Sequence, residues 1–378
     1  MNYLTTKVFS AIGVAFCFVV IGLGAWTRLA DAGLGCPDWP GCYGFVTFPT
    51  TPDEIAIAEN LYPESPVEID KIIPEVVHRW FAASLGLLAI ALLFIAFREN
   101  KLKVEAATLL LIIIGQGIFG YLTVSLKLHP LIVTSHLFGA MIATSLFLVI
   151  FMKSLKITRT YDVLVKNKTL IIIGFVLIIF QIFLGAWTST NYAARACLDL
   201  PYCQGQLVPE ADFKEGFNLF QSIGPNYLYG QMSYEARVAI HLTHRIGAIV
   251  VFFYSLFMAF KLWSNETKPV ITGFLVVLFT QVFLGVNNVL SSLPLWNAVA
   301  HNVVGVMLFL SFVMSGCLIL LDEDCDLYDQ DYSHTEYDCY YSTERVDVCN
   351  RHYCWEETRD VRVCDEYYVC YDGRGRAR

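Results

Sequence analysis

Four histidines lie inside long apolar stretches of the chain, where ionisable side chains are rare. His78, His136, His244 and His301 each fall a few residues from the same end of a hydrophobic segment. Ionisable groups within a membrane are costly and usually functional. A single histidine of this kind could be a packed, hydrogen-bonded side chain, but four at a matched depth indicate a set of ligands.

These histidines belong to a duplicated unit. Residues 24–44 read GAWTRLADAGLGCPDWPGCYG, and residues 185–205 read GAWTSTNYAARACLDLPYCQG. The segment EVVHR at 75–79 recurs as HLTHR at 241–245, and His136 recurs as His301, with offsets between 161 and 166 residues. Such a repeat predicts two similar structural units, each with two histidines, a cysteine pair and a His-Arg step.

Two imidazoles on facing helices of a four-helix bundle suit a planar metal macrocycle, with one imidazole on each face of the iron. Zinc normally takes three or four protein ligands, whereas each copy offers two histidines and a lining rich in Phe, Leu and Ile, which favours haem. Arg79 and Arg245 follow the first histidine of each copy. They could pair with a haem propionate or extend towards lipid headgroups.

The two copies differ beside the first histidine. Glu75 precedes His78 by one helical turn, so both side chains project from one face. A carboxylate there can accept protons or position water; the alternative is a structural pair with Arg79 or Arg28. The second copy has His241 at this position, for which we expect a supporting hydrogen bond to the cofactor or its ligand.

The composition places the chain among membrane proteins. It is 56% hydrophobic and 16% charged, and its mean hydropathy is +0.53. A membrane core about 30 Å thick needs roughly 20 apolar residues per helix. Segments of this kind predict an all-α integral membrane protein of eight transmembrane helices, arranged as two pseudo-symmetric four-helix bundles. They lie near residues 8–26, 75–97, 106–125, 131–152, 169–187, 237–260, 270–290 and 297–321. Trp187, at the outer end of the fifth segment, fits an interfacial aromatic belt.

Lysine and arginine set the expected orientation. They gather in the connections after spans two, four and six and are sparse in the long loops after spans one and five. The positive-inside rule therefore puts both termini in the cytoplasm and both long loops outside. Four helices per copy give the two copies one orientation, as in parallel repeats.

We expect three regions: an N-terminal bundle over 1–157 with the substrate site, a C-terminal bundle over 158–321, and a tail over 322–378. The tail holds 16 acidic residues, 7 arginines, six cysteines and nine tyrosines, with almost no aliphatic run. Such a cytoplasmic segment is expected to be disordered. Disulfides can persist in the outer loops, which carry Cys36 and Cys42 in one copy and Cys197 and Cys203 in the other.

The first long loop, TRLADAGLGCPDWPGCYG, closely resembles the signature loop of the haem A synthases, usually TRLTDSGLGCPDWP, with mild departures at Ala30 and Ala32. The Glu-x-x-His-Arg step and the paired histidines match as well. The resemblance covers residues 5 to about 321 and leaves out the tail.

This resemblance implies oxidation of the C8 methyl of haem O to a formyl group, by two successive hydroxylations, to give the haem A of cytochrome oxidase. It places substrate between His78 and His136 and makes Glu75 the essential carboxylate. It implies a permanent haem b, held in the second copy between His244 and His301, that relays electrons.

The resemblance further implies a prokaryotic plasma membrane location. It implies that Cys36 and Cys42 form a disulfide or interact with substrate, and that Cys197 and Cys203 form a second disulfide. Haem O synthase, lipid and further copies of the chain are the implied partners, with no nucleic acid; the electron donor stays open. Two alternatives compete with this assignment. A di-haem cytochrome b would explain the histidines but not Glu75, and a thiol–disulfide protein would normally use Cys-x-x-Cys rather than Cys-x5-Cys.

Overall fold

A computed structural model describes residues 4–155, 161–329, 334–349 and 354–369, with side chains described up to residue 319. It divides into two compact units, Met1–Cys317 and Leu318–Arg378. The expected boundary between the two copies, after residue 157, lies outside the described residues.

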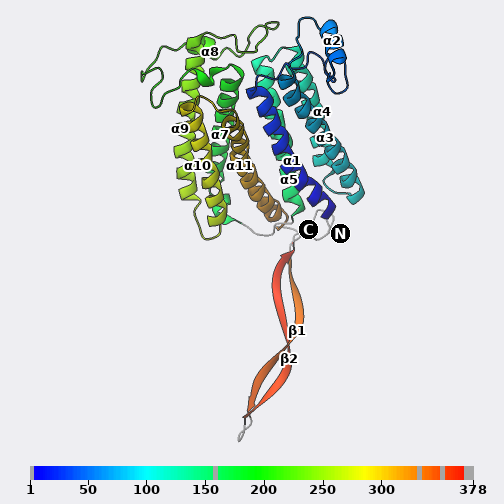
Figure 1. Cartoon of the computed structure of the whole chain (residues 1–378). Coiled ribbons are helices and arrows are strands. Elements are labelled where there is room, and N and C mark those ends of the chain that lie inside the picture. Colours follow the sequence, from blue (N-terminus) through cyan, green and yellow to red (C-terminus); the bar gives the residue numbers. More distant parts are fainter. Residues whose placement is uncertain (1–3, 156–160, 330–333, 350–353, 370–378) are drawn as a thin grey trace. The chain divides into compact units, whose positions relative to one another are not determined.

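The first unit is built from long helices (Figure 1). Within the described residues, eight helices are long and apolar enough to cross a membrane, which confirms the predicted fold class of a multi-pass, all-α membrane protein. In the first copy these are α1 (Leu4–Leu29), α3 (Ile69–Glu99), α4 (Lys103–Ser125) and α5 (Pro130–Ser154). In the second copy they are α7 (Lys168–Thr190), α9 (Tyr234–Lys261), α10 (Lys268–Leu290) and α11 (Leu295–Asp329), whose apolar part is Leu295–Ile319.

The connections between the spanning helices contain short helices. The two long loops carry α2 (Pro52–Leu61) in the first copy, and η1 (Ala193–Arg195) and α8 (Phe213–Gly216) in the second; α6 (Asp162–Lys166) precedes α7. Thr51 caps α2 in a reciprocal capping box with Glu54. Both long loops lie at one end of the helical unit, opposite the end where α1 begins (Figure 1). The two copies therefore point the same way, as a parallel repeat requires.

The duplication extends to the packing between helices. A Cβ at Gly13 on α1 would lie 2.2 Å from the ring of Phe147 on α5, and a Cβ at Gly174 on α7 would lie 2.6 Å from the ring of Phe312 on α11. These two glycines, and these two phenylalanines, are repeat counterparts. Glycine is needed at both positions because the aromatic ring occupies the space of a side chain, so each bundle locks its first and fourth spans by the same contact.

The second unit differs from the expected disorder. Its strands β1 (His334–Cys349) and β2 (Cys354–Val369) pair in antiparallel register from His334 opposite Val369 to Cys349 opposite Cys354. Tyrosine, valine and threonine are frequent in both strands, and these residue types favour extended backbone. Since a lone two-stranded hairpin is marginal in water, we assign this segment no role.

Candidate functional site

The first histidine of each copy packs against a glycine of the neighbouring helix. A Cβ at Gly24 on α1 would lie 2.9 Å from Cε1 of His78 on α3. At the equivalent place in the second copy, a Cβ at Gly185 on α7 would lie 3.1 Å from Cε1 of His244 on α9. The glycine of each Gly-Ala-Trp-Thr motif thus makes room for an imidazole.

The second histidine of each copy repeats this arrangement. A Cβ at Gly285 on α10 would lie 3.0 Å from Cε1 of His301 on α11, and a Cβ at Gly120 on α4 would lie 3.9 Å from Cε1 of His136 on α5. Every one of the four predicted ligands therefore sits on a spanning helix and faces a helix of its own copy. The sequence prediction that the histidines occupy matched positions in the two copies agrees with this geometry.

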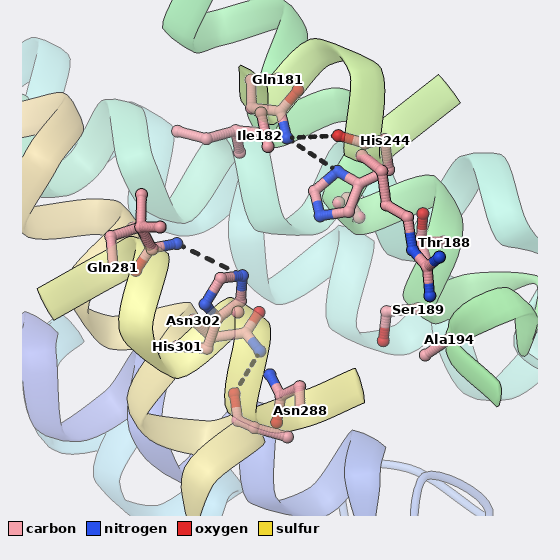
Figure 2. A pocket seen from close by; sticks show the side chains of 18 of the residues that line it. Gln181, Ile182, Thr188, Ser189, Ala194, His244, Gln281, Asn288, His301 and Asn302 are labelled. Carbon is pink, nitrogen blue, oxygen red and sulfur yellow. Dashed lines mark hydrogen bonds between the residues drawn. The ribbon is translucent and has the colours of Figure 1, made fainter. Parts of the chain in front are cut away.

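In the second copy, the two histidines line one cavity of about 460 Å³. Figure 2 shows the His244 and His301 rings pointing into it from opposite helices. The apolar walls come from α7, α9, α10 and α11, with Leu137 and Met141 of α5 closing one side. The cavity is therefore a mostly apolar space with imidazoles on two sides.

Several buried polar atoms around this cavity have no hydrogen-bond partner among the described residues. They are Nδ1 of His301, Nε of Arg245, Nδ1 of His241, and the side-chain oxygens of Gln181 and Gln281. The described residues contain no group of three or more His, Cys, Asp and Glu that could hold a metal ion by themselves. Paired imidazoles, apolar walls and unpartnered polar atoms fit haem, which brings its own four nitrogen ligands, better than they fit zinc.

Glu75 is buried, with 4% of its surface exposed. One carboxylate oxygen accepts the backbone N–H of Cys36 at 3.0 Å, and the other accepts a charged hydrogen bond from Arg79 at 2.5 Å. The ion pair that the sequence offered as the structural alternative for Glu75 therefore exists, and its partner is Arg79. The same contacts fix the carboxylate one turn from His78, as its spacing predicts.

His241, the counterpart of Glu75, is equally buried and lines the second-copy cavity. It shares this cavity with His244, one turn along α9. Among the described residues, no backbone N–H bonds to it as that of Cys36 does to Glu75, and its Nδ1 has no partner.

The arginine of each His-Arg step anchors the long loop next to the histidine. The Arg79 guanidinium donates to the backbone oxygens of Asp38 and Gly41 at 3.0 and 2.6 Å. Arg245 donates to those of Asp199 and Tyr202, both at 3.0 Å, and to Cys197 at 2.6 Å. Neither side chain simply extends towards headgroups, and contact with a propionate stays a prediction.

Each anchored loop is closed by a disulfide, Cys36–Cys42 in the first copy and Cys197–Cys203 in the second. In both, the aspartate between the cysteines accepts two successive backbone N–H groups just after the second cysteine. Asp38 accepts from Tyr43 and Gly44 at 2.5 and 2.9 Å. Asp199 accepts from Gln204 and Gly205 at 2.9 and 2.7 Å. These bonds explain why the aspartate recurs in both copies.

One residue of the site escaped the sequence analysis. The side-chain nitrogen of Gln181, on α7, lies 3.0 Å from Nδ1 of His244 (Figure 2). The signal was an amide within an apolar span, four residues before Gly185. The side-chain nitrogen of Gln281, an amide within the apolar span α10, lies 3.4 Å from Nε2 of His301.

The fold and the site define a class: a helical membrane protein of two tandem copies, each with two histidines on spanning helices beneath a disulfide loop. Residues 7–313 match the family described as cytochrome oxidase assembly protein. The chain belongs to this family, that of the haem A synthases.

Proteins named "Heme A synthase" in several bacteria are similar to the chain. That of Shewanella oneidensis is 39% identical over 307 residues, which cover 80% of this chain and 93% of the relative. That of Halalkalibacterium halodurans is 27% identical, covering 80% and 93% of the two chains. That of Wolbachia pipientis wMel is also 27% identical, covering 82% and 92%.

Proposed function

We propose that this protein makes haem A for cytochrome oxidase by oxidising the C8 methyl of haem O to a formyl group. The carrying observation is an asymmetry between two equivalent sites. Both copies hold two imidazoles against helical glycines, but only the first has a carboxylate, Glu75, one turn before its first histidine. The two copies share the histidine pair and differ in one acid–base group. This difference fits a catalytic role for the first copy and an auxiliary role for the second.

In the first copy, His78 and His136 hold the substrate haem O. Oxidation of a methyl group removes protons as well as electrons from the carbon, so the site needs a proton acceptor. The Glu75 carboxylate suits this role because its three donors, Arg79 and the N–H groups of Cys36 and Gly35, leave part of its acceptor capacity free. Its remaining lone pairs can accept a proton or orient water.

In the second copy, His244 and His301 hold haem b, which supplies a one-electron carrier when bound. The chain contributes apolar walls that exclude water, and two buried, unpartnered polar atoms at the cavity, Nδ1 of His241 and Nε of Arg245. His241 replaces the carboxylate, so this copy offers no anionic base beside its ligand. These residues support the binding of haem b and the relay of electrons rather than the oxidation of a methyl group.

The same proposal covers location and partners. The protein lies in the plasma membrane with both termini in the cytoplasm, and its two disulfide loops face the oxidising side. Haem O synthase is the expected source of substrate, lipid surrounds the spans, and copies of the chain can associate with one another.

Glu75→Gln tests the proposal, since glutamine keeps the size of the side chain and can still accept the Cys36 N–H. The full-length protein is produced in cells that make haem O, and its pigments are extracted and weighed by mass spectrometry. We expect haem A from the wild type. From the variant we expect haem O or a hydroxylated intermediate, with haem b retained.

Glu105→Gln is the matched control, because Glu105 on α4 forms an ion pair with Lys153 at 2.8 Å, away from the histidines. It should give wild-type haem A. Wild-type haem A from Glu75→Gln would remove Glu75 from catalysis. Haem b in a wild type that never makes haem A would instead favour the di-haem cytochrome.

A further inference from the structure

The two copies hold their first histidine by different groups at the same position of the repeat. Four residues before the glycine that faces the imidazole, the first copy has Val20 and the second has Gln181. His78 Nδ1 lies 3.1 Å from the backbone oxygen of Val20. His244 Nδ1 lies 3.0 Å from the side-chain nitrogen of Gln181. A backbone group in one copy is thus replaced by a side-chain amide in the other.

A second substitution makes room for this amide. Phe81 in the first copy corresponds to Gly247 in the second. A Cβ at Gly247 would lie 2.2 Å from the side-chain oxygen of Gln181, so no larger residue fits there without moving the amide. Glutamine and glycine therefore form a matched pair that only the second copy carries.

The amide also holds the backbone of the histidine that it contacts. The side-chain nitrogen of Gln181 donates to the backbone oxygen of His244 at 3.0 Å, while its side-chain oxygen is buried without a partner among the described residues. An unpaired buried amide oxygen costs free energy. The oxygen beside the imidazole is therefore available to accept a hydrogen bond.

A histidine that binds a metal through Nε2 carries its proton on Nδ1 and needs an acceptor there, as metal-bound histidines almost always have. The Val20 carbonyl supplies that acceptor to His78. As placed, the Gln181 nitrogen faces Nδ1 and the His244 backbone oxygen. A half-turn of the amide would bring its oxygen to accept the Nδ1 proton and would give up the bond to the His244 backbone oxygen.

We propose that Gln181 is a positioning residue for the haem b ligand His244, sets the electron-donating strength of its imidazole, and depends on Gly247 for its place. This inference rests on the proposal that the second copy holds haem b. An acceptor at Nδ1 makes the imidazole a stronger donor to iron and so favours the oxidised state. Loss of the acceptor should weaken haem binding and raise the reduction potential.

The test uses the full-length protein purified with its haem, in three variants. Gln181→Leu removes the amide, Gly247→Ala displaces it, and Gln116→Leu makes the same change in the first copy, where Gln116 packs over Gly139 on α5. The readouts are haem b content, its rate of loss to an apo-haemoprotein acceptor, the spectrum of the oxidised iron in paramagnetic resonance, and the reduction potential from a redox titration.

We expect Gln181→Leu and Gly247→Ala to weaken haem b binding, on the order of 10–100-fold for the leucine variant, to shift the resonance spectrum and to raise the potential. Gln116→Leu should leave haem b unchanged. Wild-type retention and potential in both second-copy variants would overturn the role of Gln181. A wild type without haem b would instead overturn the proposed function. Should Gln181→Leu fail to fold, Gly247→Ala still decides, because it keeps every polar group.

Discussion

The hydroxyl of Tyr192 donates a 2.9 Å hydrogen bond to Oδ1 of Asp31, and the two residues are counterparts in the repeat, 161 positions apart. Arg28 likewise donates to the backbone oxygen of its own counterpart, Ser189, and lies 4.0 Å from the centre of the Tyr192 ring. Residues related by two-fold symmetry contact their own counterparts only next to the axis. The pseudo-two-fold axis of the two copies therefore passes between these residues.

This position explains why the copies diverge here. Strict repetition would place Asp31 against a second aspartate and Arg28 against a second arginine, and like charges at short range repel. Tyr192 converts the first repulsion into a hydrogen bond with Asp31, and Ser189 removes the second cation while its backbone oxygen accepts from Arg28. All four residues also line the second-copy cavity, so the first copy contributes to the site of the second.

Tyr192→Phe should weaken the joint between the copies, because it removes the hydroxyl and keeps the ring beneath Arg28. A neutral hydrogen bond contributes about 0.5–1.5 kcal/mol, and bonds to charged groups somewhat more. We expect a lower Tm in detergent, measured by scanning fluorimetry. In a double-mutant cycle with Asp31→Asn, the two effects should not add.

Tyr234→Phe is the control for that cycle, since the Tyr234 hydroxyl donates to Ala196 within the second copy. Its effect should add to that of Asp31→Asn. Full additivity for Tyr192→Phe as well would mean that its bond to Asp31 contributes nothing to stability.

Gly285→Ala should displace the imidazole of His301, because the new methyl carbon would lie 3.0 Å from Cε1 of the ring. The predicted result is a loss of haem b from the purified protein, measured by its Soret absorbance per polypeptide. Gly273→Ala is the matched control on the same helix, α10, since a Cβ at Gly273 has no neighbour within 4 Å. Equal haem content in the two variants would contradict the packing role of Gly285.

The spans and the matched histidine positions could be predicted from the sequence because each leaves a local or repeated pattern; the ligand role of these histidines stays a prediction. Hydropathy alone marks the eight helices, and duplication alone singles out His78, His136, His244 and His301 among eight histidines. A membrane requires apolar segments of a fixed length, so each span can be recognised from consecutive residues without knowledge of contacts between distant segments.

Contacts between distant segments could not be predicted in this way. Trp187 fits an interfacial belt by its position, yet it is fully buried, and its indole N–H donates to the backbone oxygen of Gly216 at 2.8 Å. Arg245 was expected to contact a propionate or a headgroup, yet its guanidinium donates hydrogen bonds to backbone carbonyls of the long loop. In both cases a long loop folds back over the end of a helix, and no periodicity along the helix records which loop covers it.

Arg245→Gln should loosen the second disulfide loop, because it removes a guanidinium that donates to three backbone oxygens. Leaving a fully buried carbonyl unsatisfied costs about 1–3 kcal/mol. These three bonds are part-buried or exposed, so each should contribute less than that. We expect faster reduction of Cys197–Cys203 by a soluble phosphine, followed by thiol labelling and peptide mass analysis. Arg237→Gln is the control, because Arg237 lies on the same helix but bonds to Met232. In this variant the Cys197–Cys203 disulfide should be reduced at the wild-type rate. Equal rates for all three proteins would mean that the loop is held without Arg245.

Acid should loosen the same loop through Asp199. Backbone hydrogen bonds from Gly205 and Gln204 hold the pKa of the Asp199 carboxyl below its ordinary value of 3.8. A lowered pKa in the folded state means that these bonds stabilise the loop fully above the ordinary value. The stabilisation is lost as the pH falls through the lower pKa of the folded state.

We therefore expect phosphine reduction of Cys197–Cys203 to proceed at a constant slow rate from neutral pH down to about 4, once corrected for protonation of the phosphine, and to accelerate below it. Asp199→Asn cannot carry the charge that attracts the two N–H groups, so its loop should reduce faster at neutral pH and show no acceleration in acid. The Cys36–Cys42 disulfide in the same sample serves as the internal reference, because the substitution lies in the other copy. An acid-induced acceleration of the same size in Asp199→Asn would assign the pH dependence to another group.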